Sequence, residues 1–182
     1  MRTAGSDIHW CSASRSNVGT VRKLNEDAVL DLPDVGLWMV ADGMGGHAAG
    51  DFASGAIVSA LAGIPSPASL GALIDEVRRR LQSVNRQLNE EARDRREQVI
   101  GSTVVVLLVF GGHAVVVWAG DSRAYLFRRG ELTRLTRDHS QVEDLVLNFL
   151  EISFQGQSSN QSSIRLFVLS TAILHSAYRS SR

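Results

Sequence analysis

The sequence predicts an α+β layered sandwich, in which mainly antiparallel sheets are covered by helices packed outside them. Strand-like segments come first, helical segments follow, and strand-like segments dominate the second half, an order that favours antiparallel sheets. The chain has 182 residues, of which 44% are hydrophobic and 21% charged, as in an ordinary globular protein. We therefore expect one domain with a sizeable core.

The first three strands are predicted before any helix. Ile8–Ser14 is the first, and a polar segment with Gly19 separates it from a second strand at Asp27–Leu32. Pro33-Asp34 then turns the chain into a third, apolar strand that ends at Asp42. This third strand delivers a carboxylate to the edge of a sheet.

Two helices are predicted in the middle of the chain. Ala49–Leu61 has helix-forming composition and is ended by Pro65 and Pro67. From Ser69 onward, apolar residues recur at spacings of three and four, which predicts a long amphipathic helix. These residues are Leu70, Leu73, Ile74, Val77, Leu81, Val84 and Leu88. The opposite face mixes arginines with carboxylates, so we expect it to be a solvated surface.

The second half is predicted to be rich in strands. Val104–Phe110 and Ala114–Ala119 flank Gly111-Gly112 as a buried hairpin. Two further strands are predicted at Ala124–Phe127 and Glu131–Thr136, and a helix is predicted to begin within Gln141–Leu150.

The C-terminal part differs in composition from the rest. Glu151–Arg182 contains nine serines, one glycine and no carboxylate after Glu151. We therefore divide the chain into residues 1–146, the N-terminal and central part of a domain, and residues 147–182, an atypical Ser-rich tail. We interpret the sequence of this tail as the product of a frameshifted or abruptly terminated gene.

Composition also limits the function classes. Lys plus Arg and Asp plus Glu number 19 each, so no net field attracts nucleic acid or an anionic membrane. The single cysteine, Cys11, excludes an internal disulfide, and we expect it to be a small packed hydrophobe. There is no secretory signal pattern and no stretch of the roughly 20 apolar residues that a membrane span needs. We expect a cytoplasmic protein.

Acidic residues stand at three predicted strand ends: Glu26 with Asp27, then Asp42, then Asp121. Hard divalent cations such as Mg²⁺ and Mn²⁺ prefer oxygen ligands, so convergence of these carboxylates would make a metal cleft. Arg22 precedes the first acidic pair, and a guanidinium suits a phosphoryl group. Taken singly, these residues have an ordinary alternative, in which Arg22 pairs with Glu26 on the surface and Asp121 caps a turn.

The joint pattern resembles the metal-dependent PPM-type (type 2C) serine/threonine protein phosphatases, and within them the bacterial branch. Five motifs occur in the family's order over roughly Ile8–Val146. They are Arg22–Asp27, Asp42–Gly50, Gly101–Thr103, Gly120–Arg123 and Leu135–Ser140.

The resemblance implies a four-layer α/β/β/α sandwich, incomplete at its C-terminal end, with a binuclear Mn²⁺ or Mg²⁺ centre at one end of the sheets. It implies that Asp42 bridges the two ions and that Glu26 and the Gly43 carbonyl complete one ion's protein ligands. It implies that Asp27 interacts with an ion through a water molecule and that Asp121 helps to bind a third, more weakly held ion. Arg22 would orient the phosphate. The implied reaction is hydrolysis of phosphoserine or phosphothreonine in proteins phosphorylated by Ser/Thr kinases.

The chain departs from the family pattern at two places. Animal members have a histidine directly after the Asp-Gly pair, where this chain has Met44, and His47 is expected to be structural. The family's later Ser-Asp-Gly and Asp-Asn metal motifs are not found in this sequence. The second metal would then lack ligands, so the alternative is a catalytically impaired pseudophosphatase that binds phosphoproteins. A kinase or receptor scaffold unrelated to phosphate is the third reading.

Overall fold

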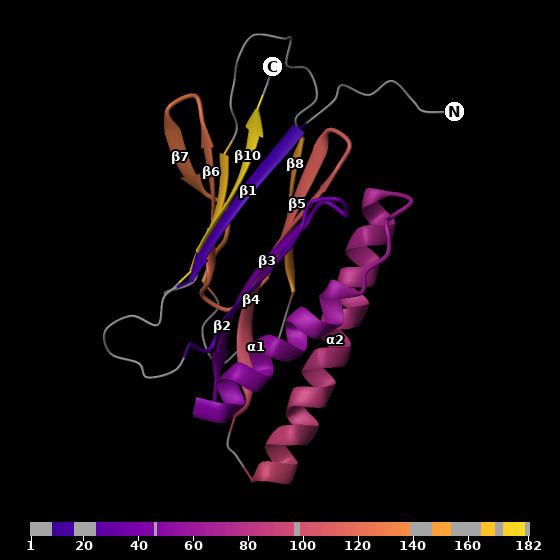
Figure 1. The fold of residues 1–182 in the computed structure, drawn as a ribbon, viewed down its shortest axis with the longest axis vertical. Helices are drawn as coiled ribbons and strands as arrows, with labels where there is room; N and C mark the ends of the chain where they lie inside the picture. Colours follow the sequence, from indigo (N-terminus) through magenta and orange to yellow (C-terminus); the bar gives the residue numbers. More distant parts are fainter. Residues whose placement is uncertain are drawn as a thin grey trace.

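The fold was analysed in a computed structural model of the chain. It describes residues 9–16, 25–45, 47–96, 99–138, 147–153, 165–169 and 173–180. Two five-stranded antiparallel sheets form the body of the molecule, as Figure 1 shows. We call the sheet with order β2-β3-β4-β5-β8 the central sheet and the sheet with order β1-β10-β9-β6-β7 the outer sheet.

The predicted strands of the first half and the predicted hairpin are all present in the structure. The central sheet consists of β2 Asp27–Leu32, β3 Leu37–Met44, β4 Gly101–Phe110, β5 His113–Ala119 and β8 Asn148–Ser153. The outer sheet consists of β1 His9–Ser16, β10 Ile173–Ser180, β9 Arg165–Leu169, β6 Arg123–Arg128 and β7 Glu131–Arg134. The antiparallel class of sheet is therefore confirmed.

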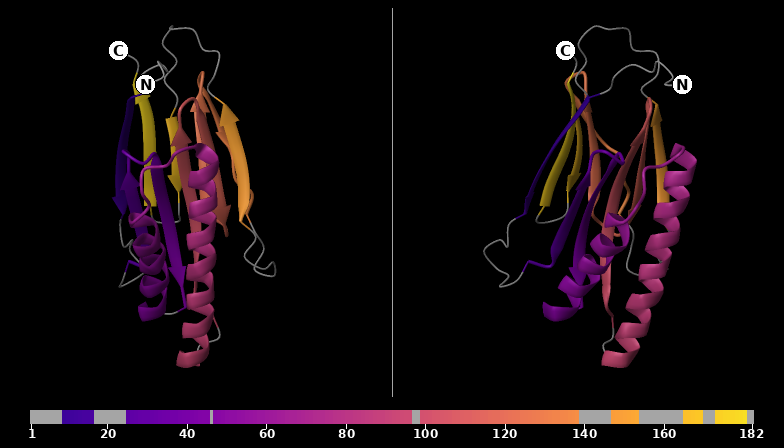
Figure 2. Two further views of the ribbon diagram at one scale, coloured as in Figure 1. Left: turned by 90° about the vertical axis from the view of Figure 1, so that its right-hand side faces the viewer. Right: turned by 45° about the vertical axis from the view of Figure 1, so that its right-hand side comes forward.

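Two helices cover one face of the central sheet, and the outer sheet packs on its other face (Figure 1). They are α1 His47–Ala62 and α2 Leu70–Arg95, which lie side by side in both views of Figure 2. Three of the four predicted layers are thus present, since no helix covers the outer sheet in the described ranges. None of the described helices combines the length and the apolarity that a bilayer crossing requires.

The central sheet is buried on both faces, which explains its nearly continuous apolar strands. One apolar cluster lies between this sheet and the helices, and it includes Met39, Val106 and the α2 residues Val77 and Leu81. A second lies between the two sheets around Trp38, which is 0% exposed and whose ring contacts that of Trp10 at 6.1 Å between centroids. Side chains of β3 therefore alternate between the two clusters.

The C-terminal segment is part of both sheets. β8 pairs antiparallel with β5 from His113↔Ser153 to Trp118↔Asn148, and β10 pairs with β1 along eight residues. The prediction of a helix within Gln141–Leu150 is wrong for Asn148–Leu150, which belongs to β8, while residues 141–146 lie outside the described residues. The exposed edge of β5 supplies the main-chain partners, and this nonlocal pairing outweighs local helix preference.

Cys11 is exposed, so the expectation of a packed cysteine is wrong. Its neighbour Trp10 faces the inter-sheet cluster, and side chains alternate along a strand. Cys11 is therefore turned to the outer face of the outer sheet.

Arg80 connects the two helices by hydrogen bonds. Arg80 of α2 donates hydrogen bonds to the carbonyls of Ala60 (2.5 Å) and Gly63 (3.0 Å) at the C-terminal end of α1. Its Nε also donates to Glu76 at 2.6 Å. Carbonyls at a helix C-terminus lack intrahelical donors, so a cation there satisfies them and also interacts well with the helix dipole.

We predict that Arg80→Ala destabilises the fold by about 1.5 kcal/mol, which for a chain of this size corresponds to roughly 3–6 °C in melting temperature. Arg79→Ala is the matched control, because Arg79 also donates to Glu76 but has its hydrogen bonds within α2. Thermal unfolding followed by circular dichroism compares the two. Equal losses of stability in the two variants would show that the hydrogen bonds from Arg80 to the end of α1 contribute nothing.

Candidate metal centre

The candidate site lies at one edge of the central sheet, where four neighbouring strands begin or end. Asp27 opens β2 and faces Asp42 near the end of β3, and Asp42 in turn faces Thr103 near the start of β4. The last pair of β4 and β5 on this side is Val104↔Ala119, which brings Gly120 and Asp121 to the same edge. The predicted acidic strand ends therefore meet along one edge, at the lower end of the sheet in Figure 1.

Asp27 and Asp42 are directly opposite each other. The Gly43 amide donates to the Glu26 carbonyl at 3.0 Å, which makes Asp27↔Asp42 a pair without mutual main-chain hydrogen bonds. In such pairs the Cα atoms are about 4.5 Å apart and the side chains are close together. Two like charges in this arrangement destabilise a sheet, whereas a cation shared between them removes the repulsion.

Both carboxylates belong to the face of the central sheet that meets the outer sheet. Trp38 and Val40 of β3 point into the inter-sheet cluster, and alternation puts Asp42 on the same face. The β3 register is continuous from Leu37 to Met44, so no bulge interrupts this alternation. The carboxylate pair thus lies at the end of the space between the two sheets.

Glu26 approaches the same strand end from the helix side. A Cβ on Gly50 of α1 would lie 2.8 Å from the Glu26 carboxyl carbon and 3.0 Å from its Oε1. A Cβ on Gly43 would lie 1.9 Å from the Gly50 carbonyl oxygen, so β3 and α1 touch here through backbone alone. Gly43 is required by this close approach, because a backbone carbonyl cannot move aside, whereas the neighbour of Gly50 is a flexible side-chain end.

The Asp121 turn is fixed to β4 by a buried hydroxyl pair. Thr103 Oγ1 and Ser122 Oγ are 2.6 Å apart, and both residues are buried. Gly120 adopts φ +97° and lies so close to Thr103 that a Cβ would be 2.7 Å from its methyl carbon. Asp121 itself is exposed. Its backbone is two strands away from Asp42, roughly 10 Å at the usual strand spacing.

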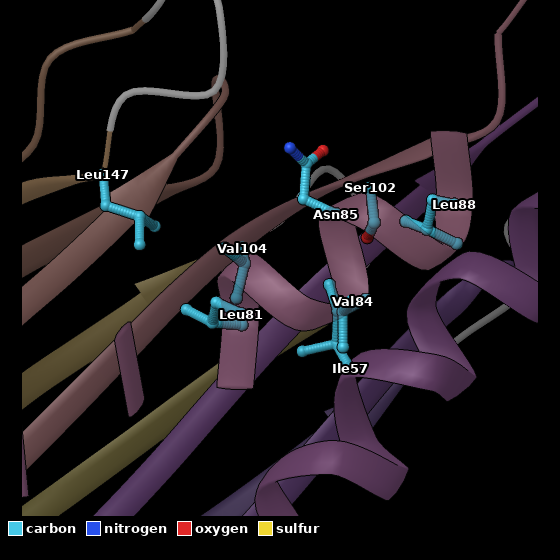
Figure 3. Close-up of a pocket in the computed structure, with 8 residues that line it drawn as sticks. All are labelled: Ile57, Leu81, Val84, Asn85, Leu88, Ser102, Val104 and Leu147. Carbon is cyan, nitrogen blue, oxygen red and sulfur yellow. The ribbon is translucent and has the colours of Figure 1, made fainter. Parts of the chain in front are cut away.

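Ser102 links the site to a small cavity on the helix side. Its Oγ is 3.0 Å from the Asp42 carbonyl oxygen, to which it donates, and its side chain lines the cavity shown in Figure 3. The other lining residues are Ile57, Leu81, Val84, Asn85, Leu88, Val104 and Leu147. The cavity holds about 20 Å³, room for little more than one water molecule, so it cannot admit a phosphorylated residue.

Asp138, in the last of the five motifs, has a structural role in the outer sheet. Arg123 donates to it from Nε (3.2 Å) and from a terminal nitrogen (2.8 Å), and Arg134 donates to it as well. These guanidinium groups, Arg123 foremost, hold the pKa of Asp138 below its usual value. The carboxylate is therefore engaged in ion pairs.

The structure brings some of the predicted residues together and separates others. Asp27 and Asp42 are adjacent, and Gly43 is hydrogen-bonded to the Glu26 main chain, whereas Asp121 is further along the edge. Arg22 lies outside the described residues, as does the side chain of His47. Among the residues with described positions, no three His, Cys, Asp or Glu side chains gather closely enough to hold an ion.

The donors present fit a divalent cation bound by few protein groups. Mg²⁺ commonly takes one or two carboxylates and keeps several waters, and Asp27 and Asp42 supply two. The Thr103–Ser122 hydroxyl pair and the Gly43–Gly50 contact were not predicted from the sequence. The glycines of the Asp42–Gly50 motif could have indicated the Gly43–Gly50 contact.

Comparison with known proteins places the chain in a family. The family model for protein phosphatase 2C matches residues 9–144. The serine/threonine protein phosphatase PstP of Mycobacterium tuberculosis is 37% identical over 135 residues, which are 74% of this chain and 26% of PstP. The serine/threonine phosphatase Stp of Listeria welshimeri is 34% identical over 140 residues, 72% of this chain and 56% of that protein. The chain thus spans about a quarter to a half of these relatives.

Solved structures show the same fold. PppA, a key regulatory component of T6SS in Pseudomonas aeruginosa, matches with a TM-score of 0.82 and 33% identity, over 96% of this chain and 98% of that one. The Streptococcus agalactiae serine/threonine phosphatase, at 18% identity, matches in fold with a TM-score of 0.79 over 96% of this chain and 100% of that one. The match to the family model over three quarters of the sequence shows that this chain belongs to the protein phosphatase 2C family.

Proposed function

We propose that this chain hydrolyses phosphoserine and phosphothreonine in proteins by means of a metal-activated water. The observation that carries the proposal is the opposed pair Asp27–Asp42 at the open edge of the central sheet. Family membership supports it, as do the names of the relatives, which are serine/threonine phosphatases. The proposed substrates are proteins phosphorylated by Ser/Thr kinases, and the proposed compartment is the cytoplasm.

We propose that Asp42 is shared by two ions, with Glu26 and the Gly43 carbonyl serving one of them. The 3.0 Å hydrogen bond from the Gly43 amide to the Glu26 carbonyl holds these residues side by side, which supports a shared ion. Asp27, opposite Asp42, acts through a water, and Asp121 contributes to a third, weaker ion. Asp42 is suited to the shared position because its strand is buried and paired on both sides.

When bound, two divalent ions lower the pKa of a bridging water and stabilise in-line displacement at phosphorus. The chain's own residues supply the rest. Asp27 and Asp42 concentrate negative charge where the cations bind, and the Thr103–Ser122 pair fixes the turn that carries Asp121. Arg22 is proposed from the family resemblance to grip and orient the phosphate through paired hydrogen bonds.

The proposed ions are Mn²⁺ or Mg²⁺. A solved structure of the PstP catalytic domain contains two manganese ions, which supports Mn²⁺ for a chain of the same family. The carboxylate oxygens of Asp27 and Asp42 are hard donors and suit either ion.

We predict that Asp42→Asn abolishes Mn²⁺-dependent release of phosphate from a phosphothreonine peptide, with a loss of at least about 100-fold from removal of the shared ligand. Mn²⁺ at 100 times its Kd should stabilise the native chain by about 2.7 kcal/mol, and the variant should lose this stabilisation. Asp34→Asn, in the exposed turn between β2 and β3, is the control.

Malachite-green phosphate release and thermal unfolding with and without Mn²⁺ measure these two effects. Peptide binding without phosphate release in the native, Mn²⁺-loaded chain would favour the pseudophosphatase instead. Equal Mn²⁺ stabilisation of native and Asp42→Asn protein would place the ion elsewhere.

We further predict that Gly50→Ala weakens Mn²⁺ binding without weakening the fold. The added methyl would occupy the place of the Glu26 carboxyl group, a flexible side-chain end that can move away. Gly55→Ala is the matched control in the same helix, because a Cβ there meets nothing within 4 Å. Each change should stabilise α1 by up to about 1 kcal/mol through helix propensity.

Isothermal titration with Mn²⁺ should therefore show a loss of about tenfold or more for Gly50→Ala and no change for Gly55→Ala. Unchanged affinity in Gly50→Ala would remove Glu26 from the proposed ligand set.

A further inference from the structure

Two exposed apolar residues lie immediately beyond the carboxylate pair. Met44, the last residue of β3, is 45% exposed, and Val99, which precedes β4, is 59% exposed. Exposed large apolar residues are few in the described part of the chain, and these two lie near the same glycine at the candidate site. The others are Phe110, Leu132 and Phe149.

The side chains of Met44 and Val99 both lie close to Gly101. A Cβ on Gly101 would lie 3.7 Å from Met44 Cγ and 4.0 Å from both Met44 Sδ and Val99 Cγ1. Gly101 is the register partner of Met44, so the absence of a side chain on β4 lets the methionine lie across the strand. At Gly45, which has φ +131°, a Cβ would lie 2.8 Å from the Val99 carbonyl oxygen, so the main chain after Met44 lies close to that of Val99.

This apolar pair, Met44 with Val99, lies on the same face of the central sheet as the carboxylate pair. Met44 is two residues after Asp42 on β3, and alternation puts both side chains on one side. The separation along the strand is about 7 Å, twice the rise per residue. An extended peptide has the same repeat, so its side chains two positions apart are also about 7 Å apart on one side.

We propose that the apolar pair Met44–Val99 receives an apolar side chain of the phosphoprotein substrate, two positions from the phosphorylated residue. This inference rests on the proposed function, which puts the phosphate at Asp42. The partner is then an extended segment whose phosphorylated side chain reaches the carboxylate edge, while its neighbour on the same side covers Met44 and Val99. These two residues determine specificity and take no part in the chemistry.

The test uses two peptides that carry a non-hydrolysable phosphonate analogue of phosphothreonine. One has Leu at both positions −2 and +2, and the other has Asn, which is similar in size but polar. Fluorescence anisotropy with Mn²⁺-loaded protein should give about fivefold tighter binding of the Leu peptide, as partial burial of one leucine predicts. Equal binding of the two peptides, or binding of neither, would overturn the proposal.

The variants make polar replacements of nearly the same shape. Met44→Gln with Val99→Thr should reduce the preference to less than about twofold, and each single change should reduce it in part. Leu132→Gln is the matched control, because Leu132 is 60% exposed but lies in β7 of the outer sheet, and the fivefold preference should persist. A preference that survives the double change would assign it to other residues.

Mn²⁺-dependent hydrolysis of para-nitrophenyl phosphate separates the two proposals, because this substrate has no peptide. Hydrolysis without any preference for the Leu peptide overturns the proposed role of the apolar pair and leaves the proposed reaction intact. A Leu preference that depends on Met44 and Val99, without hydrolysis, upholds the apolar pair and contradicts the proposed reaction.

Discussion

The register between β2, β3 and β4 is the constraint on which the candidate site depends. It runs without interruption from Leu32↔Leu37 to Asp27↔Asp42, and a slip of one residue would move Asp42 to the helix face. The far end of the sheet fixes this register. Gly36 has φ +73°, and its carbonyl accepts from the Val109 amide at 2.7 Å, so the turn and β4 are locked together. A turn at one end of the sheet thus determines which carboxylates meet at the other.

The helix layer holds the edge of the site from outside. The start of α1 touches β3 where the Gly50 carbonyl lies against Gly43, and a side chain on Gly43 would collide with that carbonyl. The end of α1 is held by Arg80 of α2. Because α1 is fixed at both ends, the Glu26 side chain that lies against Gly50 has little room to move toward the helix. Packing far from the edge therefore contributes to the placement of Glu26.

Local sequence pattern predicted the elements whose stability is mostly local. The α2 helix follows from the spacing of Leu73, Val77 and Leu81, and the β4–β5 hairpin follows from its apolar runs and Gly111. The strand β8 was not predicted, because its pairing with β5 is set by partners 30 to 40 residues away in sequence. The fourth, helical layer was inferred from the family, and the described residues do not include it. The division of the chain between residues 146 and 147 stays a prediction.

The site was predictable in its residue types and less so in its contacts. Acidic residues at strand ends indicated that Asp27 and Asp42 would meet, and they do. The contact of Glu26 with Gly50 and the Thr103–Ser122 hydrogen bond depend on how α1 and the Asp121 turn pack on the sheet. The spacing of residues along the sequence does not determine this packing. The roles of Arg22, Glu26, Asp27, Asp42, Gly43 and Asp121 stay predictions.

We propose that the opposed carboxylates of Asp27 and Asp42 mark a divalent-cation site. The most direct measurement is a crystal structure of the full chain soaked in Mn²⁺, with anomalous diffraction recorded at the manganese edge. We predict an anomalous peak at about 2.1 Å from an Asp42 carboxylate oxygen, on the side that faces Asp27. Peaks only at other places, or an Asp42 carboxylate with no ion beside it at saturating Mn²⁺, would contradict it.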